Sequence, residues 1–143
     1  MGRRKKQIDI RIYDNRHSNK VLPEHCRVLL KYFNLVADLF SAKLIERGFS
    51  VAKFPLIYLM LDADISESEE PKTSPHILVK EALEVVVGFP TSCLDENNQT
   101  ARIASFIGRH LRSLAPRLDA DYDVLKEVEE LIVAEGFDLE IVC

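Results

Sequence analysis

The sequence predicts an α/β fold of the α+β sandwich kind, with about four mainly antiparallel strands and helices packed on one face in a split βαβ-like order. Three patterns lead to this prediction. Apolar and polar residues alternate over residues 7–13, which is typical of a strand with one buried face. Apolar residues then recur at helical spacing from Pro23 to Gly48, and the short apolar run Leu56–Leu61 indicates a strand buried on both faces.

The helix predicted from Pro23 to Gly48 is the longest element. Proline is tolerated in a first helical turn, because the N–H that it lacks would have no partner there. The apolar stripe of this helix consists of Cys26, Leu29, Leu30, Phe33, Val36, Phe40 and Leu44. Gly48 can adopt the left-handed conformation of a helix C-cap, and Phe49 follows where a Schellman motif places its hydrophobic contact.

The second half of the chain predicts one more strand and two more helices. β-Branched residues favour a strand over residues 83–89, while residues 76–82 fit either an extension of that strand or a short helix. A second helical stripe covers residues 103–114, and Pro116 is expected to end that helix. A third helix is predicted at residues 121–135.

The chain is expected to close with a last strand at residues 138–142. The helix ends at residues 44–51 and 132–139 share a Gly-Phe pair, so two strand–helix–strand halves would give the split βαβ order. The plainer interpretation is that both helices end with the same capping chemistry and that no duplication occurred.

The composition bounds the class of protein. With 143 residues, 47% of them hydrophobic, we expect one domain over residues 1–143 that folds without a metal or a disulfide framework. The three cysteines are widely spaced, which fits a reducing compartment. No signal peptide is recognisable, and Leu56–Leu61 is far shorter than the about 20 residues that span a bilayer. We therefore expect a cytoplasmic protein that contacts no membrane.

Charge is divided unevenly along the chain. Residues 1–61 contain twelve Lys/Arg and five Asp/Glu, whereas residues 62–143 contain seven and eighteen. The basic part begins with a flexible arm at residues 1–6, and the acidic part begins with a mobile loop at residues 62–75. Such a division favours a protein whose surface steers association with a partner of opposite charge.

The acidic residues are the first candidate site. The loop and the last helix present carboxylates that could dock a basic protein surface: Asp62, Asp64, Glu67, Glu69, Glu70, Asp121, Asp123, Glu127 and Glu130. Our first hypothesis is a non-catalytic intracellular protein-binding domain, most concretely an immunity protein or antitoxin-like inhibitor that neutralises a partner toxin. The plainer interpretation is ordinary solubility charge.

Asp62 and Asp64 also suggest a metal site, because carboxylates at a strand end can hold a hard divalent cation. The calcium-loop pattern fails here, since the turn glycine would fall on Glu67 and the bidentate acid on Thr73. A magnesium site with two or three carboxylates and waters stays open, and a small metal-assisted enzyme is an alternative function. An exposed acidic loop is the plainer interpretation.

Basic residues offer the other alternative, nucleic-acid binding. The arm Arg3–Lys6 could bind phosphates, and a later helix carries Arg102, Arg109 and Arg112 close to one stripe. A solvated terminus is the plainer interpretation of the arm. The first strand, rich in isoleucine, offers no aromatic stacking platform.

No stretch of the sequence specifies a reaction. The histidines, His17, His25, His76 and His110, include no pair at helical metal-ligand spacing, and no glycine-rich phosphate loop or nucleophile elbow is present. His110 falls on an apolar stripe and is expected to be a hydrogen-bonded core histidine. We expect neither a catalytic residue nor a cofactor.

Overall fold

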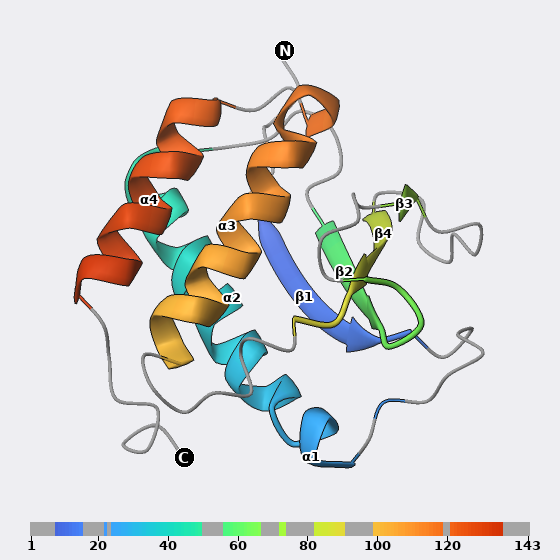
Figure 1. The fold of residues 1–143 in the computed structure, drawn as a ribbon. Helices are drawn as coiled ribbons and strands as arrows, with labels where there is room; N and C mark the ends of the chain where they lie inside the picture. The colour runs from blue at the N-terminus through green and yellow to red at the C-terminus, as the bar shows by residue number, and fades with distance from the viewer. Residues whose placement is uncertain are drawn as a thin grey trace.

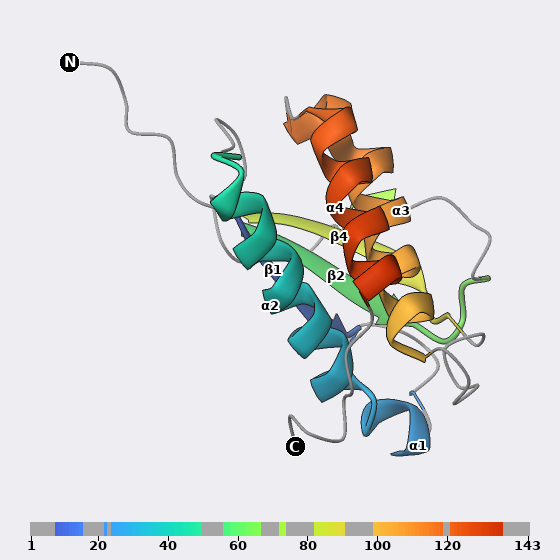
Figure 2. The same ribbon diagram turned by 90° about the vertical axis from the view of Figure 1, so that its left-hand side faces the viewer.

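The computed structural model describes eight stretches of the chain: residues 8–15, 22, 24–49, 56–66, 72–73, 82–90, 99–118 and 121–135. Within them the chain forms an α+β fold with a parallel sheet and helices stacked against one of its faces (Figures 1 and 2). The N-terminal arm at 1–6, most of the acidic loop at 62–75 and the last strand predicted at 138–142 lie outside the described residues.

Three strands make up the body of the sheet: β1 (Asp9–Asp14), β2 (Leu56–Asp62) and β4 (Ala82–Gly88). They run parallel in the order β1-β2-β4, and only the two-residue β3 (Lys72–Thr73) is antiparallel, along the outer side of β4. The predicted sheet of about four mainly antiparallel strands is therefore wrong. For β1 and β2 the physical reason is the connection between them, because the long helix that follows β1 carries the chain back to the end of the sheet where β1 began.

The helix predicted from Pro23 to Gly48 is divided in two. A single turn, α1 (Glu24–Arg27), is followed by a break and then by α2 (Leu30–Glu46). The break occurs at Val28 and Leu29, where the Leu29 N–H donates to the Cys26 carbonyl at 3.2 Å, a tighter turn than the α-helical one. Periodicity did not reveal the break because both segments keep their apolar residues on the buried side.

The predicted Schellman cap at the end of α2 is confirmed. Gly48 has a φ of 72°, a backbone conformation that glycine adopts without steric cost. Its N–H donates to the Ile45 carbonyl at 3.0 Å, and the Phe49 N–H donates to the Leu44 carbonyl at 3.0 Å. Phe49 is buried, so the cap also adds an apolar contact.

Two further helices complete the helical layer. α3 (Gln99–Leu118) is longer than predicted, since Pro116 lies inside its last turn and does not end it. A proline so close to a helix end removes one backbone hydrogen bond near the terminus, which the rest of the helix tolerates. α4 (Tyr122–Glu135) agrees with the predicted third helix and packs against both α2 and α3.

The core lies between the sheet and these helices. In the parallel register Ile10 pairs with Ile57 and Ile57 with Leu83, so their side chains share the helix-covered face. The next such row is formed by Ile12, Leu59 and Val85, and all six side chains are buried. The alternate residues of β1, which include Arg11 and Tyr13, are exposed on the other face.

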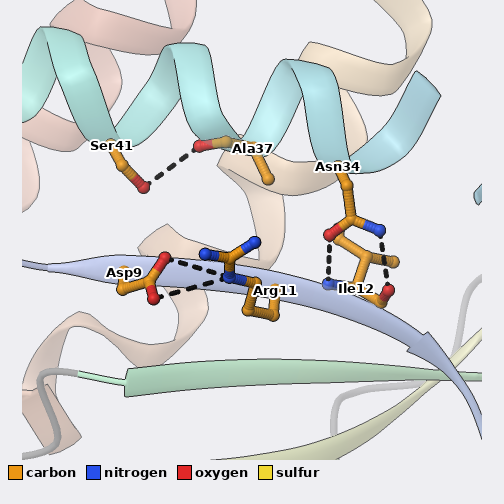
Figure 3. Close-up of polar contacts among 6 residues, drawn as sticks. All are labelled: Asp9, Arg11, Ile12, Asn34, Ala37 and Ser41. Atoms are coloured by element: carbon orange, nitrogen blue, oxygen red, sulfur yellow. Dashed lines mark hydrogen bonds and ion pairs between the residues drawn. The ribbon is translucent and has the colours of Figure 1, made fainter. Parts of the chain in front are cut away.

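The outer edge of β1 is closed by a side chain from α2 (Figure 3). The Asn34 amide accepts from the Ile12 N–H at 2.9 Å and donates to the Ile12 carbonyl at 2.9 Å, as a neighbouring strand would. The same amide group donates to the Leu30 carbonyl one turn earlier, which fixes its orientation. At Ile12 this edge therefore offers no free backbone groups for another strand.

No helix in the described part of the chain is both long enough and apolar enough to cross a membrane.

Candidate functional site

A pocket of about 400 Å³ opens on α3 where α4 packs beside it. Its lining residues are Ala101, Arg102, Ser105, Phe106, Arg109, Arg112 and Glu129. All three arginines that the sequence placed near one stripe of this helix line this pocket. The structure thus shows that the three arginines line one pocket, whereas the sequence placed them only on one helix.

Helix geometry explains the convergence. Arg102, Ser105, Arg109 and Arg112 follow one another at steps of three, four and three residues, which stacks them along one side of α3. Other positions of α3 are buried against the core: Ile103, Ala104, Ile107, Leu111 and Leu114. Burial of that apolar side therefore holds the arginine side toward the surface.

Arg112 is held in place by two side chains of α4, Glu129 and Tyr122. Its Nε donates to Glu129 Oε1 at 2.9 Å and its Nη2 donates to Glu129 Oε2 at 3.3 Å, the two-pronged arrangement that a guanidinium and a carboxylate favour. Its Nη1 donates to the Tyr122 hydroxyl at 3.3 Å, and the guanidinium carbon lies 6.0 Å from the centre of the Tyr122 ring. These contacts fix the orientation of the guanidinium in the pocket wall.

Glu129 reaches Arg112 by crossing α3 at a glycine. A Cβ atom added at Gly108 would lie 2.0 Å from Glu129 Oε1 and 2.6 Å from its Cγ, distances that no real contact allows. Because Gly108 has no side chain, the Glu129 side chain can cross α3 at this position and reach Arg112.

The Arg112–Glu129 pair serves orientation more than stability. Burial raises the pKa of Glu129 above its ordinary value despite the contact with Arg112. The hydrogen bonds to Tyr122 and Glu129 raise the pKa of Arg112, although its partial burial opposes this. The raised pKa values disfavour the charged form of Glu129 but favour the charged form of Arg112. We attribute this difference to the deeper burial of the carboxylate, which loses more hydration than the guanidinium.

His110 lies behind the arginine side and is buried. Burial, together with the charge of Arg109, lowers its pKa from 6.5 to about 4, so the ring is neutral at physiological pH. Its Nε2 lies 3.4 Å from Arg109 Nη2, and its ring packs edge-on against Phe106. The prediction of a core histidine is confirmed, but its Nδ1 has no hydrogen-bond partner within the described structure.

The acidic residues predicted on the last helix have separate local roles. The Asp121 carboxylate caps α4, accepting from the N–H groups of Asp123 and Val124 at 3.0 and 3.4 Å. Glu127 forms an ion pair with Arg47, just beyond the end of α2. Asp123 and Glu130 are exposed.

Asp62, at the end of β2, is buried and not presented on the surface. Its Oδ2 accepts from Asn15 Nδ2 at 2.9 Å and its Oδ1 accepts from the Asp64 N–H at 2.8 Å. The Asp62 carbonyl accepts from the Phe89 N–H at 3.2 Å, which ties together the ends of β2 and β4. Asp64 itself is exposed.

The described carboxylates of the two acidic regions, at the end of β2 and on α4, do not lie together. Figure 1 shows the end of β2 at the lower right and α4 on the opposite side of the molecule, beyond α3. Glu67, Glu69 and Glu70 lie outside the described residues, so only Asp62 and Asp64 represent the loop. Nor do the described residues contain any group of three or more His, Cys, Asp or Glu side chains that could hold a metal ion.

Cys26 is buried, and burial raises the pKa of its thiol. This agrees with its predicted position on an apolar stripe.

The sequence patterns did not single out Glu129, Gly108 or Tyr122, and two of these residues had a recognisable signal. Glu129 follows Leu125 by four residues and precedes Ile132 by three, so it interrupts the apolar stripe of α4 with a carboxylate. Gly108 is an isolated glycine inside a helix, which usually has a packing reason. Tyr122 carries no comparable signal.

No protein-family model matches this chain, and neither a curated protein nor a solved structure is significantly similar to it.

Proposed function

We propose that this protein is a binding domain that takes up an anionic ligand in the arginine-lined pocket of α3. The observation that carries this proposal is the convergence of Arg102, Arg109 and Arg112 on one pocket. Ligand sites are typically concave and of about 300–1,000 Å³, with a few charged or polar groups that fix the ligand. The pocket lies within that range.

The chemistry of the lining favours an oxyanion. A guanidinium presents planar N–H groups that match the oxygens of carboxylates and phosphates, and it keeps its charge at every physiological pH. Arg112 is already oriented by Glu129 and Tyr122, so little side-chain freedom would be lost on binding. Ser105 adds a neutral hydroxyl beside the arginines.

Isothermal titration calorimetry with inorganic phosphate, sulfate and citrate tests the proposal. We expect saturable binding of at least one of these anions, weakened at least tenfold by the double change Arg102→Ala and Arg109→Ala. The matched control is Arg117→Ala, which removes an exposed arginine of the same helix that does not line the pocket. Equal affinities in the parent and the double variant would contradict the proposal.

A second candidate function keeps the hypothesis of an inhibitor that docks a basic partner, now confined to α4. The observation that favours it is the outward face of this helix, where Asp123, Glu127 and Glu130 are all exposed. Exposed carboxylates on a rigid helix would steer association with a positively charged protein.

Binding of poly-lysine, measured by fluorescence anisotropy, separates the two candidates. Under the second candidate, Asp123→Lys and Glu130→Lys together abolish binding at low salt while the arginine variants leave it unchanged. If the lysine variants bind poly-lysine as well as the parent does, the helix face has no docking role.

A further inference from the structure

The sheet has a second face, the outer face, which points away from α2, α3 and α4 (Figures 1 and 2). Successive side chains of a strand alternate between the two faces, and residues paired in a parallel register lie on the same face. The outer face therefore has three rows: Asp9, Leu56 and Ala82; Arg11, Tyr58 and Glu84; and Tyr13, Met60 and Val86.

Burial on the outer face decreases from β4 toward β1. Its β4 residues are buried and its β2 residues are half-buried, whereas Arg11 and Tyr13 on β1 are exposed. Tyr13 is 44% exposed although its ring packs edge-on against that of Tyr58, with the ring centres 5.3 Å apart. The part of the outer face on β1 and β2 is thus an aromatic surface that is partly open to solvent.

The composition of β2 indicates a strand that is covered on both faces. Its outer residues Leu56, Tyr58 and Met60 are apolar or aromatic, like the residues that it turns toward the helices. A sheet face that meets water usually bears polar residues, whereas parallel sheets are usually covered on both sides. The described helices cover one side only, so the outer face is suited to a partner.

We propose that a second copy of this chain covers the outer face, in a two-fold symmetric dimer with the two sheets face to face. This surface is separate from the arginine pocket, so the proposal does not depend on anion binding. Pairing through the β1 edges is opposed at Ile12, where Asn34 already bonds both backbone groups. A two-fold interface joins the same patch of both copies, so the patch must be complementary to itself.

Asp9 and Arg11 give the outer face this complementarity. Arg11 Nε lies 3.2 Å from Asp9 Oδ1, and the two side chains are 46% and 38% exposed for Arg11 and Asp9 (Figure 3). When a second copy is turned by half a revolution over the first, Asp9 of each copy can face Arg11 of the other. Each charge then gains a second partner of opposite sign. A partner charged with one sign throughout would instead be repelled by one of these two residues.

The size of the outer face predicts a weak dimer. A strand of seven residues is about 23 Å long, and three strands about 4.8 Å apart are about 14 Å wide. A stable interface buries about 800 Å² on each partner, which is well above the plan area of such a face. We therefore expect a dissociation constant of about 10–100 µM, typical of a reversible association.

Sedimentation equilibrium of the full chain at about 1–500 µM tests the proposal. We expect the mean mass to rise with concentration from that of one chain toward that of two. Arg11→Asp places two acids on each copy and Asp9→Arg places two arginines, so either change alone should weaken dimerisation at least tenfold by repulsion. An equal mixture of the two variants should dimerise about as tightly as the parent, because every contact between unlike copies again joins opposite charges.

The mixture separates an interface from an effect on folding. The exposed pair contributes little to stability, so both variants are expected to fold, which circular dichroism checks. The matched control is Lys126→Asp, which reverses an exposed charge on α4, on the helix side of the sheet, and should leave dimerisation unchanged.

Three results would overturn the proposal: a single chain at every concentration, single variants that dimerise like the parent, or a mixture of folded variants that stays monomeric. The first is the result expected if another protein or another segment of the same chain covers the outer face. The second would place the dimer contact on a different surface. Anion titrations of the arginine pocket are independent of these results, so the proposed function and the dimer can fail separately.

Discussion

The arginine pocket on α3 and the carboxylate corner at the end of β2 use their charged side chains in opposite ways. Asp62 is buried, and both of its carboxylate oxygens accept hydrogen bonds from the protein itself. Arg102, Arg109 and Arg112 instead line an open pocket, and Arg112 is held there by the Glu129 carboxylate. Both regions were visible in the sequence as clusters of charge.

The difference shows that neighbouring donors and acceptors decide what a charged residue does. At the end of β2 a sharp turn aims the Asp64 N–H at Asp62, and Asn15 reaches across from the end of β1. The Asp62 carboxylate thus stabilises the turn after β2 and links it to the end of β1. Along α3 the backbone groups are bonded within the helix, so the arginines have only side chains or ligands to contact.

The largest expected effect comes from removing the internal carboxylate. Asp62→Ala leaves the Asn15 amide and the Asp64 N–H without their acceptor in a buried place, and we expect unfolding to require about 3 kcal/mol less free energy. Urea denaturation measures this. Asp64→Ala, at an exposed position, is the control and should change stability by less than about 0.5 kcal/mol. Similar losses for both variants would mean that Asp62 has no special role.

His110 provides the next test, because its buried ring stays neutral at physiological pH behind the arginine pocket. Its pKa of about 4 in the folded protein lies below the unfolded value of 6.5. At a pH between these two values, His110 binds a proton in the unfolded chain but stays neutral in the folded protein, which favours unfolding. The part of the stability that depends on a neutral His110 is therefore complete above pH 6.5 and is lost as the pH falls toward 4. We expect stability to be about 2 kcal/mol lower at pH 5 than at pH 7 from this group alone.

Urea denaturation at both pH values measures the effect, and His110→Phe is the matched variant because it cannot titrate. The difference between pH 7 and pH 5 should shrink by that amount in the variant. An unchanged difference would show that other groups cause the pH dependence.

Gly108→Ala gives a smaller effect whose sign depends on Glu129. In the parent the new methyl group displaces the Glu129 side chain from Arg112, and we expect a loss of about 1–2 kcal/mol. In a Glu129→Ala background the obstacle is gone, and alanine should stabilise the helix by up to about 1 kcal/mol over glycine. A double-mutant cycle by thermal denaturation measures both. The same sign in both backgrounds would refute the proposed path of Glu129 across α3.

The smallest effect is expected at the ion pair of Arg47 and Glu127, which belongs to neither region. Both side chains are partly exposed, so the coupling between Arg47→Ala and Glu127→Ala should stay below about 1 kcal/mol and fall with added salt. A coupling that exceeds this value and does not change with salt would contradict this expectation. The pair would then resemble the buried contacts of Asp62.

Local patterns in the sequence predicted β2, α4 and the cap at Gly48, because each depends on neighbouring residues along the chain. Strand direction was predicted wrongly, because it depends on the connections between strands, although the continuous apolar run of β2 is typical of a strand in a parallel sheet. The break before α2 and the persistence of α3 through Pro116 depend on tertiary packing, which can override local preference.

The site was predictable only in part. The spacing of Arg102, Arg109 and Arg112 was visible, but the pocket between them and Glu129 requires two helices to pack at one glycine. The separation of Asp62 and Asp64 from the acidic residues of α4 could not be predicted from the sequence, because the distance between elements is set by the fold.

The amide of Asn34 blocks the addition of another strand to the β1 edge of the sheet at Ile12. A strand edge normally invites another strand, from a second copy of the chain or from an unrelated peptide. Here one side chain from α2 imitates the missing neighbour at Ile12, so recruitment of a partner by strand addition is discouraged at that point. Enlarging this sheet by design would therefore begin at position 34 on the helix.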